Sequence, residues 1–251
     1  MKCARYLLPL ILVGIWQALC MLKVIPAQML PSPFRILTGF KDLLVIGMPP
    51  GHLLSYHVLY SLCRVAWGFF AAAVLAIPLG LLMGWSHRLR DLMNPIVELI
   101  RPIPPLAWIP IAILWFGIGM KSAAFIIFLG AFFPILLNTI SGVLTINPLF
   151  FEVAQTLNAD KRDVFLKVLI PGAVPSIFVG MRIGVGIGWM TLVAAEFTGV
   201  KTGYGLGYMI MTARDIQRPD EIIAGMLVIG LIGVLINMLL KGVESRIVRW
   251  Q

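Results

Sequence analysis

Charged residues are scarce in this sequence. They make up 12% of its 251 residues, whereas 60% are hydrophobic and the mean hydropathy is +0.96. A soluble domain carries about a quarter charged residues and about half apolar ones. The composition therefore excludes a soluble enzyme, and it excludes a disordered protein, which needs low hydrophobicity. The net charge of +9 indicates the basic cytoplasmic loops of a membrane protein rather than nucleic-acid binding.

Motifs for catalysis and for metal binding are also missing. The three cysteines include no CxxC pair, so neither a disulfide framework nor a zinc site is expected. His52, His57 and His87 have no cysteine or carboxylate at ligand spacing, and we expect no metal site. The sequence has no G-x-x-x-x-G-K-[ST] loop to bind ATP phosphates and no G-x-S-x-G nucleophile motif. We therefore expect no catalytic residue and no cofactor, and the protein is not expected to be an enzyme.

Long apolar runs are what the sequence has instead. A helix needs about 20 apolar residues to cross a bilayer. Runs approaching this length predict six transmembrane helices, at roughly 5–22, 60–85, 104–120, 123–143, 177–199 and 222–241. The first run is longer than the apolar part of a signal peptide and no small-x-small site follows it, so we expect a retained span. The third run is rich in proline and should be kinked or re-entrant. The predicted fold is all-α and polytopic.

Two polar stretches separate the spans. Residues 23–59 are expected to form a loop with a short surface helix near 34–45. Residues 144–176 hold the densest charge, and their helix near 151–169 should end at Pro171 and Pro175. We expect two parts: residues 1–55, an N-terminal transmembrane helix and external loop, and residues 56–251, a core with a cytoplasmic loop at about 144–176.

The distribution of Lys and Arg predicts the orientation, because cytoplasmic loops carry more of them. Eleven lie in 2–5, 88–101, 161–167 and 241–249, and seven lie in 23–41, at 121 and in 201–218. The first group should be cytoplasmic. Both termini and the loop at 144–176 are then inside the cell.

The cytoplasmic loop contains a specific motif. It reads EVAQTLN from residue 152 and VLIP from residue 168. This resembles the EAA loop of ABC importer permeases, whose pattern is E-A-A, three residues, Gly, nine residues, I-x-L-P. Here Val153 replaces the middle Ala and Asn158 stands where Gly is usual, but Asn is the next residue after Gly to tolerate a left-handed backbone. The resemblance implies an ATPase-coupling loop made by Glu152, Val153, Ala154, Leu157, Asn158 and Pro171.

Other segments resemble the taurine, sulfonate and nitrate importer permeases in particular. They include RPIPPLAWIP from residue 101, WFGIG from residue 115 and WMTLVAAE from residue 189, and the likeness covers about residues 30–251. The resemblance implies a type I importer permease fold in the cell membrane. It also implies four kinds of partner: cytoplasmic ABC ATPase subunits that bind the ATP, an extracytoplasmic solute-binding protein, a second permease copy and the lipid bilayer.

The fifth predicted span contains charged residues at a spacing of seven. Arg182, Trp189 and Glu196 therefore share one helix face, which is about 21 Å long. A charge facing lipid costs at least about 2.5–3.5 kcal/mol, so this face should point into the bundle. It is a candidate lining of the translocation path, and Trp115 is another. The alternative is that the charges lie near the two membrane interfaces.

These observations favour the permease subunit of an ABC importer for a small, anionic solute such as a sulfonate, taurine or nitrate. Bicarbonate or a heterocyclic vitamin or pyrimidine precursor is the alternative substrate. Two other classes of protein stay open, an ion-driven secondary carrier and a membrane subunit that transports nothing. The carrier is disfavoured because the halves show no repeat and the spans lack several paired ionisable residues.

Overall fold

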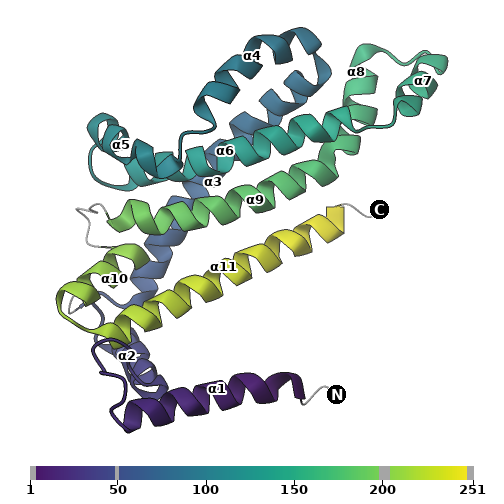
Figure 1. The fold of residues 1–251 in the computed structure, drawn as a ribbon. Coiled ribbons are helices and arrows are strands. Elements are labelled where there is room, and N and C mark those ends of the chain that lie inside the picture. Colours follow the sequence, from purple (N-terminus) through teal and green to yellow (C-terminus); the bar gives the residue numbers. More distant parts are fainter. Residues whose placement is uncertain (1–3, 49–50, 198–203, 248–251) are drawn as a thin grey trace. The chain divides into compact units, whose positions relative to one another are not determined.

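The computed structural model describes residues 4–48, 51–197 and 204–247, and its regular elements in these ranges are all helices (Figure 1). In chain order they are α1 (Ala4–Met21), α2 (Pro33–Val45), α3 (Leu54–Trp85), α4 (His87–Ile100), η1 (Pro105–Trp108), α5 (Ile109–Phe116), α6 (Met120–Leu144), α7 (Pro148–Thr156), α8 (Lys161–Val164), η2 (Phe165–Leu169), α9 (Ile170–Phe197), α10 (Leu206–Asp215) and α11 (Pro219–Ile247). The predicted all-α fold and the short helix near 34–45 are confirmed.

Among the described residues, four helices are long and apolar enough to cross a membrane: Leu54–Trp85, Met120–Leu144, Lys161–Phe197 and Pro219–Ile247. The pair His87–Ile100 and Pro105–Phe116 would be a fifth span, bent by 80°, and Leu10–Met21 is a shorter apolar helix. Counting α1 and the bent pair, the described helices agree roughly with the six predicted spans.

The third predicted span, at 104–120, is not one straight helix. Its residues form the 3-10 turn η1 and the eight-residue helix α5, which Gly117 ends with φ +72°. Proline cannot donate a backbone hydrogen bond and restricts the residue before it, so Pro104 and Pro105 break the path from α4. The expected kink is confirmed, and α4 supplies the rest of the apolar length.

The prediction that Pro171 and Pro175 end the helix of the polar loop is wrong. The chain passes from α8 through the π-helical turn η2 directly into α9, and both prolines lie inside that continuous helix. The wider turn changes the hydrogen-bond register just before Pro171, where Ile170 N donates to Phe165 O. A proline in the first turn after such a register change loses little, because its missing N–H is not needed there.

The chain divides into two compact units, residues 1–62 with 199–232 and residues 63–198 with 233–251, whose boundaries fall within α3, after α9 and within α11. In the second unit α6 and α9 run side by side (Figure 1). Glycines permit this approach: a Cβ on Gly184 would lie 2.9 Å from the backbone oxygen of Ala131. On α3, a Cβ at Gly80 would lie 2.7 Å from Thr139 Cβ. Small residues thus let α3 and α9 both pack closely on α6.

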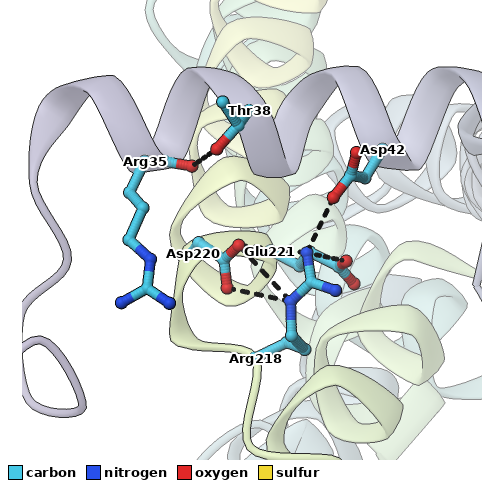
Figure 2. Close-up of polar contacts among 6 residues, drawn as sticks. All are labelled: Arg35, Thr38, Asp42, Arg218, Asp220 and Glu221. Carbon is cyan, nitrogen blue, oxygen red and sulfur yellow. Dashed lines mark hydrogen bonds and ion pairs between the residues drawn. The ribbon is translucent and has the colours of Figure 1, made fainter.

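In the first unit, an ion-pair cluster joins α2 to the start of α11. Figure 2 shows Arg218 between Asp42, Asp220 and Glu221. The Nη2 atom of Arg218 lies 2.8 Å from Asp42 Oδ2, 3.1 Å from Asp220 Oδ2 and 2.8 Å from Glu221 Oε1. The hydrogen bond with Asp220 is the largest cause that raises the pKa of Arg218 above its ordinary value. Arg218 therefore holds together two buried carboxylates and one from α2.

Candidate functional site

The segment that resembles an EAA loop forms a helix, a tight turn and a second helix. Asn147 caps α7, because its Oδ1 accepts from Leu149 N at 3.0 Å, and Pro148 occupies the first helical position. Asp160 caps α8 in the same way, accepting from Asp163 N at 2.6 Å. These side-chain caps fix where the two helices begin, and the turn expected at Asn158 divides the helical segment predicted over 151–169.

Asn158 makes the turn between α7 and α8. Its φ is +58°, so the predicted left-handed backbone is confirmed. The N–H of Ala159 donates to Ala154 O at 3.0 Å, and the N–H of Asn158 donates to Gln155 O at 2.9 Å. This pair of bonds is a Schellman motif, in which the residue after the helix C-cap is left-handed and is usually Gly. Asn158 therefore fills the structural role of the family's glycine.

Helix α7 leaves an apolar face uncovered. The side chains of Leu149, Phe150, Val153 and Leu157 are all exposed, and Leu157 is 76% exposed. Their spacing of one, three and four residues places them on one side of the helix. Ala154 differs, because it is only 8% exposed. We name the four exposed side chains the α7 apolar face.

Glu152 and Pro171 lie at other points of the loop. Glu152 is exposed, and its backbone oxygen accepts from Thr156 Oγ1 at 2.6 Å. Pro171 lies in the first turn of α9 beside a cavity of about 500 Å³ that Phe150 and Lys167 also line. The loop residues named from the sequence are thus spread over α7, its turn and the base of α9. Their role in coupling stays a prediction.

Glu196 is buried near the end of α9 and forms an ion pair across the second unit. Its Oε1 lies 2.5 Å from Nη1 of Arg64 on α3, and each residue is 1% exposed. A charged pair without water needs close geometry, since its desolvation cost is otherwise not recovered. The pair ties α3 to α9, and Glu196 faces the interior of the unit as the spacing predicts.

Arg182 and Trp189 lie on the same helix, nearer to its N-terminal end. Arg182 is partly covered and pairs with Glu244 of α11. Trp189 is buried and contacts Gly233 of α11, where a Cβ would come within 3.2 Å of the indole nitrogen. Two of the three stripe residues therefore contact α11 and the third contacts α3. Trp115 lies elsewhere, 59% exposed on α5, with its ring 5.9 Å from that of Phe125. Whether any of the four lines a path stays a prediction.

A cavity of about 430 Å³ lies between the α4–α5 connection, α6 and α9, in the second unit. Its lining is Arg101, Ile103, Pro105, Trp108, Leu129, Gly130, Phe133, Pro134, Leu137, Asn138, Ile183 and Ile187. We name it the Arg101 cavity. None of the stripe residues lines it. Its lining residues on α6 lie along the middle of that helix.

The sequence analysis did not predict a functional role for Arg64 or Glu244, and it noted the segment from Arg101 to Pro110 only for its likeness to the family, not as part of a cavity. A signal for Arg64 exists, because an arginine within an apolar span needs a buried partner. Asn138 gives a weaker signal as an amide inside an apolar run. No periodicity, however, could show that the bend after α4 brings Arg101 to the wall of α6.

Comparisons with known proteins agree with this fold. Residues 76–250 match the sequence profile of the family described as binding-protein-dependent transport system inner membrane component. The chain is 37% identical to the taurine transport system permease protein TauC of Escherichia coli, over 96% of this chain and 86% of that protein. It is also 37% identical to the nitrate import permease protein NrtB of Leptolyngbya laminosa, over 95% of this chain and 85% of that protein.

A solved structure shows the same fold. A chain of the inward-facing MetNI methionine ABC transporter superposes with a TM-score of 0.61 at 25% identity, covering 78% of this chain and 94% of that one. The helices, the family profile and the relatives agree on the class predicted from the loop motif. The chain belongs to the family of binding-protein-dependent transport system inner membrane components, the permeases of ABC importers.

Proposed function

We propose that this chain is the permease subunit of an ATP-driven importer and that α7 is its coupling helix. It works with a second copy of itself, with cytoplasmic ATPase subunits that bind the ATP, and with an extracytoplasmic solute-binding protein. Family membership supports the transport role and disfavours a secondary carrier or a subunit that transports nothing. The chain itself has no hydrolytic role.

The observation that carries the coupling role is the α7 apolar face. Four large apolar side chains lie uncovered on a short helix in the most charged loop of the chain. Exposed apolar patches with a polar surround are typical of protein interaction sites. A groove on the ATPase would cover this face, while the Asn158 turn and the two side-chain caps keep its shape.

The Lys and Arg bias supports placing this loop, and both termini, in the cytoplasm. ATP binding by the partner would draw the two coupling helices together. The bundle would then switch between inward-facing and outward-facing states, as two populated arrangements of the same helices. The solute is a small compound with an anionic group: the relatives that are permeases for taurine and for nitrate support taurine, another sulfonate or nitrate.

The test compares substitutions on α7. Leu157→Glu and Val153→Glu each place a charge in the docking face, and they should abolish co-purification of the ATPase and reduce uptake at least tenfold. Both side chains are exposed, so the fold of the loop is not disturbed. Gln155→Glu is the control, since it adds the same charge about 200° around the helix. If both face variants retain the ATPase and full uptake, α7 is not the coupling helix.

Ala154→Arg is a second, different perturbation. The motif alone suggests that it blocks docking, but Ala154 is buried inside the loop. A charged side chain there would first displace the turn itself, at a desolvation cost. We therefore expect loss of the ATPase with this variant too, together with a changed loop conformation, which the Leu157 and Val153 variants should not show.

A further inference from the structure

The Arg101 cavity has one cationic group, and that group is unpaired within the described part of the chain. Arg101 follows the last turn of α4 and lines the cavity with an exposed side chain. It makes no side-chain hydrogen bond or ion pair with any residue in 4–48, 51–197 or 204–247. A guanidinium presents five donors in a planar fork, which matches the oxygens of a carboxylate, sulfonate or phosphate.

The part of α6 that lines the same cavity carries hydrogen-bond acceptors. The Nδ2 atom of Asn138 donates to Pro134 O at 2.8 Å, which leaves its Oδ1 as the free end of the amide. Pro134 has no N–H, so the carbonyl of Gly130 lacks its usual helical donor four residues on. Both Gly130 and Asn138 line the cavity. The Gly130 carbonyl and Asn138 Oδ1 would accept hydrogen bonds from a ligand N–H, and a simple anion would leave both of them without a donor.

The remaining lining supports a small organic body. Trp108 supplies an aromatic ring, which attracts an ammonium group, and the other side chains are apolar. A volume of about 430 Å³ is within the range of small-molecule sites, roughly 300–1,000 Å³. No carboxylate from the residues that the structure describes lines the cavity, so a purely cationic ligand would meet Arg101 without compensation.

We propose that the Arg101 cavity is a solute-binding site within the permease and that it takes a small zwitterion, an aminoalkyl compound with an oxoanion head. The head pairs with Arg101, and the ammonium group bonds to Asn138 Oδ1 and the Gly130 carbonyl beside Trp108. This rests on the proposed transport function and narrows its substrate class. Nitrate would use Arg101 alone and would leave the acceptors of α6 unbonded.

Binding to the permease–ATPase complex in lipid nanodiscs, without the binding protein, tests the site. Taurine is the zwitterionic probe, ethanesulfonate has the same head without the ammonium group, and nitrate is the inorganic anion. By calorimetry we expect taurine to bind at least tenfold more tightly than either of the other two. Arg101→Gln should weaken the binding of taurine at least tenfold. Asn138→Leu should weaken the binding of taurine but leave the binding of ethanesulfonate unchanged. Arg88→Gln, an exposed arginine on α4 outside the cavity, should match the wild type.

Two results would overturn the proposal: no binding of taurine in the millimolar range, or equal binding by the wild type and Arg101→Gln. Equal binding of taurine and ethanesulfonate would overturn the zwitterion assignment. The transport function is tested separately, by ATP-dependent uptake with the binding protein present. If uptake occurs and Arg101→Gln does not change it, the internal site fails while the importer role holds. If taurine binds as described but the wild-type complex takes up nothing, the importer role fails instead.

Discussion

Nη1 of Arg64 lies 2.5 Å from Oε1 of Glu196, and both side chains are fully buried between α3 and α9. The two residues are 132 positions apart in the chain. Removing one partner of such a pair leaves the other charge buried, which costs roughly 3–5 kcal/mol. The contact therefore changes what a substitution at Glu196 should do. The seven-residue spacing alone predicts that Glu196→Gln alters transport and leaves folding intact.

We now expect Glu196→Gln to lower the thermal stability of the purified complex, because Arg64 loses its carboxylate. Arg64→Met should do the same. The double variant Arg64→Met with Glu196→Leu should recover most of the loss, since neither charge is left buried. Thermal unfolding followed by size-exclusion chromatography measures all three. Additive losses in the double variant would show that the two residues do not stabilise the unit as a pair.

Asn158 should tolerate glycine and reject a β-branched residue. Its φ of +58° costs an ordinary side chain about 1–2 kcal/mol, and a β-branched one more. Asn158→Gly should keep ATPase co-purification and uptake, whereas Asn158→Val should reduce both. Gln155→Val, on the helix just before the turn, is the matched control. Normal uptake by Asn158→Val would mean that coupling does not need this turn.

Alanine substitutions at Gly184 and Gly186 should have different effects on the melting temperature, although both glycines lie on α9. A Cβ at Gly184 would lie 2.9 Å from the backbone oxygen of Ala131, whereas nothing lies within 4 Å of one at Gly186. Gly184→Ala should force α6 and α9 apart and lower the melting temperature. Gly186→Ala should leave it unchanged or raise it, since Ala favours a helix by about 1 kcal/mol. Equal effects at both sites would contradict the close packing.

Arg218 should matter to the stability of the first unit, whereas its neighbour Arg214 should not. Arg218→Gln leaves Asp220 and Glu221, both buried, without their cation. We expect a loss of about 2 kcal/mol, less than for a fully buried pair because the side chain of Arg218 is 39% exposed. Arg214→Gln is the control, because its pair with Asp215 is exposed. Resistance to proteolysis within residues 204–232 would report the difference.

Orientation can be checked at two exposed glutamines. A single cysteine at Gln155 should react with a membrane-impermeant reagent only from the cytoplasmic side. One at Gln217 should react only from outside, because the loop that follows α10 belongs to the less basic set. Labelling of both from the same side would contradict the proposed topology.

Much of the fold could be predicted because it depends on local chemistry. Apolar runs of spanning length, the helix near 34–45 and the break caused by the prolines near 104 follow from residue type and spacing alone. The turn at Asn158 belongs here too, since few residues accept a left-handed backbone. The errors were also local in origin: Pro171 and Pro175 look like helix ends, but a π-helical turn before them lets the helix continue.

The sequence by itself determined a polytopic helical membrane protein, the turn at Asn158 and the family, because hydropathy and turn chemistry act within a few residues. Only the tertiary structure decided that Glu196 meets Arg64, that Arg182 meets Glu244, and that Arg101 and Asn138 line one cavity. The physical reason is that these pairings depend on how distant helices pack. A seven-residue spacing places charges on one face, but the close approach that glycines such as Gly184 allow selects what that face contacts.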